Sequence, residues 1–163
     1  MTRTAHRLFL GAFAAAVLTL TATRAAAQPS SAADPRGRWI TASGNIEVEV
    51  APCGNALCGT ATKVLGNRSM SREGAEMAPA DAASVVGLKV LRDFAPVVAD
   101  AADGAPGEWA GEIYNRENGK TYRSTLRVST DLKPEGELLV HPYIGLPLFG
   151  KTQRWQRADG VAR

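Results

Sequence analysis

The sequence has 163 residues, of which 45% are hydrophobic and 21% are charged, with 19 Lys and Arg against 16 Asp and Glu. This length and composition are typical of one globular domain large enough to bury a core. The basic residues form no cluster, so no nucleic-acid partner is expected.

The first 27 residues have the pattern of a secretory signal peptide. Arg3 and Arg7 form a positive n-region, residues 8–20 form an apolar run, and small residues lead to a cleavage site after Ala27. A retained N-terminal anchor is the alternative, but the apolar run is short for a membrane span. We therefore expect a periplasmic or secreted protein whose mature chain has no transmembrane span. Because Arg3, Arg7 and Arg24 leave with the peptide, that chain is formally neutral.

One β domain is predicted from residue 37 to residue 158. A flexible leader over residues 28–36 precedes it and a C-terminal tail over residues 159–163 follows it. Short segments with alternating apolar residues predict strands at 37–41, 45–50, 58–65, 85–94, 137–143 and 151–157, with a hairpin over 109–126. Two long loops, 66–84 and 96–107, separate them. A short helix around residues 80–85 is the alternative within the first loop.

The hairpin at residues 109–126 has the clearest local pattern in the chain. Apolar residues alternate with charged ones on both sides of a polar turn that contains Asn118-Gly119, a pair that favours positive φ. The side chains of this turn are rich in hydrogen-bonding groups. Ordinary turn chemistry accounts for them, and a contact surface at the barrel rim is the alternative.

Cys53 and Cys58 are closely spaced on either side of a predicted turn. A structural disulfide is the interpretation that an exported protein favours. A redox-active pair or half of a metal site is the alternative, but four residues separate the cysteines and few further ligands are available. We expect the disulfide to fix the turn, and no metal or cofactor.

The ordered segments GRWIT, CGNALCG, GLKVL, the hairpin and LPLFGKTQRWQR resemble a bacterial exported family, domain of unknown function 2147 (DUF2147), over residues 37–157. The resemblance implies a single antiparallel, lipocalin-like barrel with no settled activity. It also implies that Trp39 lies on the first strand and that Arg154 or Arg157 packs across its indole at one barrel end. The predicted fold is thus an all-β, up-and-down barrel of about eight strands with no long helix.

The pattern of polar residues does not favour an enzyme. The predicted mature chain has one histidine, His141, on the polar face of a strand, and no nucleophile-elbow, phosphate-binding or zinc-protease motif. Paired carboxylates occur only on strand faces that read as solvated. No catalytic residue is predicted.

A barrel of this size can enclose side chains or one small ligand. We expect a small apolar or lipid-like molecule to bind in the mouth, and the candidate inward-facing residues are Trp39, Trp109, Ile113, Tyr122 and Leu126. The alternative is a cell-envelope interaction protein or stress-related structural protein with a filled barrel. In that case Leu148 and Phe149, on a proline-framed loop, form a protein contact.

Overall fold

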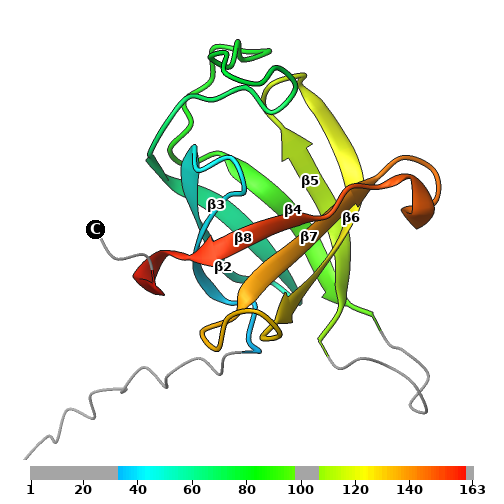
Figure 1. Cartoon of the computed structure of the whole chain (residues 1–163). Helices are drawn as coiled ribbons and strands as arrows, with labels where there is room; N and C mark the ends of the chain where they lie inside the picture. The colour runs from blue at the N-terminus through cyan, green and yellow to red at the C-terminus, as the bar shows by residue number, and fades with distance from the viewer. Residues whose placement is uncertain (1–32, 98–106, 161–163) are drawn as a thin grey trace, which may run out of the picture.

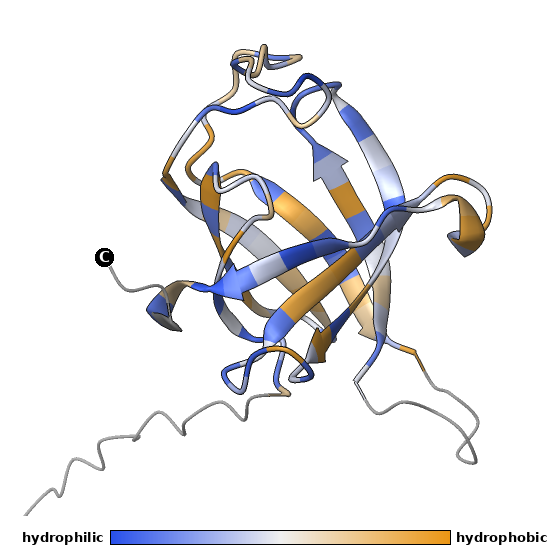
Figure 2. Ribbon diagram, in the orientation of Figure 1, coloured by the Kyte–Doolittle hydropathy of each residue, from blue (hydrophilic) through white to orange (hydrophobic). Residues whose placement is uncertain are grey.

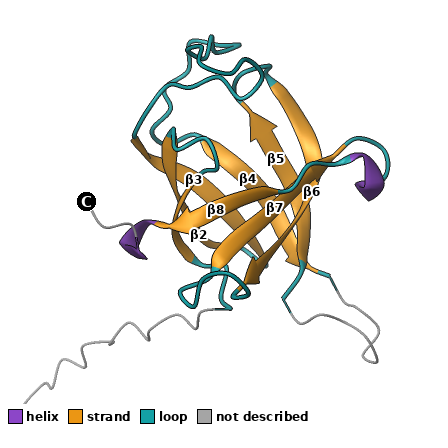
Figure 3. Ribbon diagram, viewed as in Figure 1, coloured by secondary structure: helices purple, strands orange, loops and turns teal. Residues whose placement is uncertain are grey.

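The computed structural model describes residues 33–97 and 107–160, and the predicted signal peptide lies outside them (Figure 1). Eight strands follow one another: β1 (Gly37–Ile40), β2 (Ile46–Cys53), β3 (Ala56–Val64), β4 (Lys89–Pro96), β5 (Trp109–Asn115), β6 (Lys120–Ser129), β7 (Glu137–Tyr143) and β8 (Gln153–Arg157). The described residues otherwise form loops and two single-turn 3-10 helices, η1 (Pro147–Phe149) and η2 (Ala158–Gly160) (Figure 3).

Each strand pairs antiparallel with its neighbour in sequence, and β8 pairs with β1 to close the barrel. The all-β, up-and-down barrel predicted from the sequence is confirmed. Closure leaves no free edge, so short strands can stand without a second sheet. Among the described residues there is no helix with the length and hydropathy needed to cross a membrane.

The barrel interior follows from period-two alternation along the strands. On β2, Val48 and Val50 are buried while Glu49 is exposed. On the β5–β6 hairpin, register pairs Trp109 with Leu126 and Ile113 with Tyr122, so their side chains share the inner face. The buried core cluster comprises Trp39, Val48, Val50, Leu57, Val90, Leu91, Phe94, Ile113, Leu126, Leu138, Val140 and Trp155.

The two ends of the barrel differ. At one end, here called the base, the β2–β3 and β6–β7 turns lie beside residues 33–36, and the last of these residues lead into β1 (Figure 1). At the other end, here called the mouth, four connections surround the opening: residues 41–45, 65–88, 116–119 and 144–152. The long β3–β4 connection, residues 65–88, lies over this end in Figure 1.

Three local predictions need correction. Residues 80–85 form no helix, and β4 begins at Lys89 because the turn around Gly87 still belongs to the preceding loop. In the β5–β6 turn only Gly119 has positive φ, at 70°, whereas Asn118 does not. The turn therefore spans residues 116–119 and closes with an amide of Gly119 that donates to the Asn115 carbonyl.

Candidate ligand cavity at the barrel mouth

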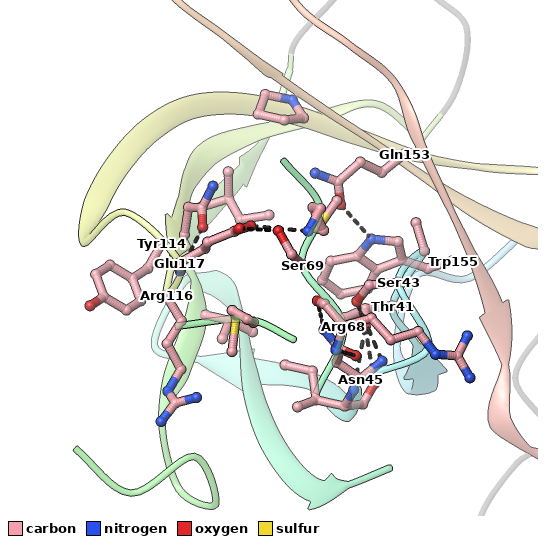
Figure 4. A pocket seen from close by; sticks show the side chains of 18 of the residues that line it. Thr41, Ser43, Asn45, Arg68, Ser69, Tyr114, Arg116, Glu117, Gln153 and Trp155 are labelled. Atoms are coloured by element: carbon pink, nitrogen blue, oxygen red, sulfur yellow. Dashed lines mark hydrogen bonds between the residues drawn. The ribbon is translucent and has the colours of Figure 1, made fainter. Parts of the chain in front are cut away.

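A cavity of about 1620 Å³ opens at the mouth (Figure 4). Its floor is apolar and consists of inward-facing strand residues, among them Ile46, Val90, Ile113, Tyr122 and Trp155. These side chains belong to the upper edge of the core or pack against it. The volume exceeds the roughly 300–1,000 Å³ typical of small-molecule sites, and part of it is open to solvent.

Polar groups lie above this floor and could orient a ligand. The Trp155 indole N–H donates to Gln153 Oε1 over 3.1 Å (Figure 4). The N–H is therefore satisfied, and the ring contributes an apolar surface to the cavity lining. Thr41 and Ser43, which follow β1, lie beside Trp155 with their hydroxyl oxygens 3.3 Å apart (Figure 4). The combination of an apolar floor with a few polar groups at the rim is the usual chemistry of a small-molecule pocket.

Asn45 anchors the start of the long mouth loop, residues 65–88. Its side-chain amide donates to the Arg68 carbonyl and its Oδ1 accepts from the Arg68 amide, both over 2.7 Å. Its own carbonyl accepts from the amides of Leu65 and Gly66. Asn45 is buried, with 7% of its surface exposed, because all of its polar groups are used in this way.

Glu117, in the β5–β6 turn, holds the same loop from the other side through hydrogen bonds to residues 69–71, here called the clasp. Its Oε1 accepts from the hydroxyls of Ser69 and Ser71, and its Oε2 accepts from the Met70 amide over 3.0 Å (Figure 4). These donors favour the carboxylate form and lower the pKa of Glu117 to about 2. The clasp therefore holds a charged acceptor at neutral pH.

Tyr114 at the end of β5 and Arg116 in the turn also bind the loop. The Tyr114 hydroxyl donates to Asp81, which lowers the pKa of Asp81 and raises that of Tyr114. The Ala80 amide donates to the Arg116 carbonyl over 2.9 Å. Turn chemistry accounts for Asn115 and Asn118, whose side chains accept from amides of the turn. It does not account for Tyr114 and Glu117, whose side chains bind the loop that lies over the mouth.

Replacing Glu117 with glutamine should loosen the loop. Gln keeps one acceptor oxygen but loses the charge that strengthens three hydrogen bonds, so tryptic cleavage after Arg68 and Arg72 should accelerate by roughly fivefold. Glu112→Gln, on the exposed face of β5, is the matched control and should leave the rate unchanged. Equal cleavage of the wild type and Glu117→Gln would show that the clasp does not restrain the loop.

The lowered pKa of Glu117 predicts that the stability of the fold depends on pH. A folded-state pKa of about 2, below the ordinary value of 4.5, stabilises the protein above pH 4.5, and this contribution is lost as pH falls toward 2. The difference in urea-unfolding midpoint between the wild type and Glu117→Gln should therefore be full at neutral pH and shrink through this interval.

The base is sealed by Trp39 and Arg157. The Arg157 guanidinium lies 4.2 Å from the centre of the Trp39 ring and donates to the carbonyls of Asp34, Arg36 and Glu135. Partial burial lowers the pKa of Arg157, and the nearby carboxylates of Asp34 and Asp159 oppose this shift only in part. The Trp39 indole donates to the carbonyl of Pro35 over 2.8 Å. The end of the predicted leader thus packs against the base.

Arg154 does not share this role. It follows Gln153 and precedes Trp155, both of which face inward, so its own side chain points outward and pairs with Glu137 over 3.1 Å. Of the two arginines considered for barrel-end packing, only Arg157 contacts the indole.

The five predicted ligand-facing residues divide between the two ends. Ile113 and Tyr122 line the cavity. Trp39 and Leu126 are fully buried in the core and do not line the cavity. Trp109 also lies near the base, beside residues of the β2–β3 turn. The sequence pattern therefore indicated which residues face the interior, but it did not indicate how deep in the barrel each of them lies.

His141, on β7, is hydrogen-bonded through both ring nitrogens to the β7–β8 loop. Its Nε2 lies 2.8 Å from the Pro147 carbonyl, which can only accept, so Nε2 donates this bond, and Nδ1 is hydrogen-bonded to the Thr152 hydroxyl over 2.9 Å. Both ring nitrogens are occupied in holding this loop. Leu148 and Phe149 lie on it, strongly exposed, and Phe149 also borders the cavity.

The two cysteines form a disulfide between Cys53 and Cys58, at the β2–β3 turn of the base. A carboxylate oxygen of Asp93 lies within 4.8 Å of both sulfurs. Because the sulfurs are bonded to each other, they offer no thiolate to a metal in this state. The pair is therefore a structural link in the oxidised protein.

These features define a class of protein: a closed eight-stranded up-and-down barrel with a sealed base and a cavity at its mouth. Within this class, the chain belongs to the DUF2147 family, whose model matches residues 37–157 and is described as an uncharacterized protein conserved in bacteria. The chain matched none of the curated proteins and none of the solved structures with which it was compared.

Proposed function

We propose that this protein is an exported, non-enzymatic barrel that binds a small apolar or lipid-like molecule in the cavity at its mouth. The observation that carries this proposal is the apolar floor formed by Ile46, Val90, Ile113 and Trp155 under an opening of lipid size. Burial of apolar ligand surface against such a floor supplies the main binding free energy. Export is supported by the disulfide and by the signal-peptide pattern at the N-terminus.

The alternative, a structural or envelope-interaction protein with a filled barrel, is less well supported. Side chains fill the base half of the interior, where Trp39, Phe94 and Leu126 are fully buried, but the cavity occupies the mouth half. A non-enzymatic role is supported by His141, whose ring nitrogens are both engaged in holding a loop. That arrangement leaves His141 without a free ring nitrogen to activate a nucleophile.

The proposal predicts an apolar adduct on the purified protein. Native mass spectrometry should show a bound lipid-like mass, and the delipidated protein should increase the fluorescence of an apolar dye such as anilinonaphthalene sulfonate. Ile46→Trp, which places a large ring in the cavity wall, should weaken dye binding by at least about tenfold. Arg127→Trp is the matched control, because Arg127 is exposed on the outer face of β6 and does not line the cavity.

Folding of both variants is checked by far-ultraviolet circular dichroism. Absence of any adduct together with equal dye binding by the wild type and Ile46→Trp would refute ligand binding in the mouth.

A further inference from the structure

Exposed apolar side chains gather at the mouth. The described residues include ten large hydrophobic side chains that are strongly exposed. Those at the mouth are Val64, Leu65, Met70, Val86, Ile144, Leu146, Leu148 and Phe149, and those at the base are Val97 and Leu132. Scattered exposed hydrophobics are normal on a protein surface, but their concentration at one end marks an interaction site.

The β7–β8 loop, residues 144–152, holds its apolar side chains outward. His141 fixes the Pro147 carbonyl, and the Lys151 amide donates to the Pro142 carbonyl. Gly150 lies so close to His141 that a Cβ there would be 2.4 Å from Nε2. In this braced loop Leu148 is 86% exposed and Phe149 is 69% exposed. Figure 2 shows the apolar segment projecting from the side of the barrel.

Lysines surround the same opening. Of the five lysines in the sequence, Lys63, Lys89 and Lys120 lie at the mouth ends of β3, β4 and β6, and Lys151 follows η1. All four are exposed and make no ion pair within the described part of the chain. The fifth, Lys133, is at the base, where it pairs with Glu137 over 3.8 Å. The mouth therefore combines unpaired ammonium groups with exposed apolar side chains.

We propose that the mouth docks on an anionic phospholipid bilayer. Leu148 and Phe149 enter the interface between headgroups and acyl chains, and the lysines face the lipid phosphates. Apolar side chains inserted at a basic rim are the combination that holds peripheral proteins on anionic membranes. Here they come from several loops around one opening that also carries four exposed lysines, and this charge is complementary to an anionic lipid surface.

Docking in this orientation turns the cavity toward the lipid. Ile144 and Phe149 belong both to the apolar rim and to the cavity wall. A lipid-like molecule could therefore pass between bilayer and cavity along apolar side chains, without crossing water. This last consequence rests on the proposed ligand-binding function, whereas membrane docking itself does not.

Vesicle flotation tests the docking. The protein without its predicted signal peptide, residues 1–27, is mixed at low salt with vesicles of phosphatidylcholine alone or of equal parts phosphatidylcholine and phosphatidylglycerol. The wild type should float with the anionic vesicles and remain unbound with the neutral ones. The double variant Leu148→Ser, Phe149→Ser should lower the partition coefficient at least about tenfold, since two inserted side chains are lost. Leu132→Ser, 70% exposed at the base, is the matched control and should bind like the wild type.

A second pair of variants tests how much the lysines at the mouth contribute to vesicle binding. Lys120→Glu at the mouth end of β6 should weaken binding to anionic vesicles about tenfold. Arg127→Glu, an exposed cation near the base end of the same strand, should change binding by less than about twofold, because distance from the surface screens it.

Three outcomes would overturn the proposal: no flotation of the wild type, equal binding to neutral and anionic vesicles, or equal loss in mouth and base variants. Sedimentation that shows a dimer abolished by Leu148→Ser, Phe149→Ser, without vesicle binding, would assign the loop to self-association instead. Ile46→Trp separates the two proposals, because it should lose dye binding and still float.

Discussion

Substitution of Gly111 with valine should destabilise the barrel by about 3 kcal/mol or more, or prevent folding. Gly111 lies on β5 and faces the barrel interior. A Cβ at this position would lie 2.6 Å from the carbonyl oxygen of Arg92 and 2.8 Å from the Phe94 Cα. These are backbone atoms of the neighbouring strand, so a rotamer change cannot relieve the clash. Urea unfolding followed by circular dichroism provides the measurement.

The control for this prediction lies one residue away. Ala110 precedes Gly111 on β5 and its side chain points to the outer face, so Ala110→Val adds a β-branched residue where space is available. Its unfolding midpoint should stay within about 0.5 kcal/mol of the wild type. If Gly111→Val unfolded at the wild-type urea concentration, the close approach of β4 and β5 would not constrain this position.

The strands could be predicted because their signal is local. The β5–β6 hairpin shows its inner face through alternation alone, and the predicted bounds of residues 137–143 coincide with β7. The choice between Arg154 and Arg157 was also within reach of the sequence. An inward Trp155 places Arg157 inward and Arg154 outward by period two.

The depth of a residue within the barrel was not readable in the same way. Ile113 and Leu126 lie on the same face of one hairpin, yet Ile113 lines the cavity and Leu126 is buried in the core beneath it. Alternation assigns a side chain to a face, whereas depth depends on strand tilt and on what closes each end. Here the base is closed by Trp39, Arg157 and the backbone of residues 34–36.

The hydrogen bonds that hold the mouth loop could not be predicted from the sequence, for a different reason. Glu117 and Ser69 are separated by 48 positions, and Asn45 and Arg68 by 23. Neither pair belongs to a periodic segment, and each polar residue has a sufficient local explanation in turn chemistry. Only the closed topology, which brings the β1–β2, β3–β4 and β5–β6 connections to one end, makes these residues neighbours.

Loss of the Trp39 side chain should have a comparably large effect at the base. Trp39 is fully buried, its indole N–H donates to the Pro35 carbonyl, and Arg157 stacks on its face. Trp39→Ala should lower the free energy of unfolding by about 3–5 kcal/mol, since a large cavity opens in a packed core. It should also leave the Arg157 guanidinium without its aromatic partner.

Two further variants separate packing from the polar contacts. Trp39→Phe keeps most of the ring volume but leaves the Pro35 carbonyl without its donor, so an intermediate loss is expected. Trp109→Ala removes a tryptophan that is only partly buried near the same end, and it should cost less than Trp39→Ala. Urea-unfolding midpoints that ranked Trp109→Ala as the more damaging change would contradict the assignment of Trp39 as the residue that seals the base.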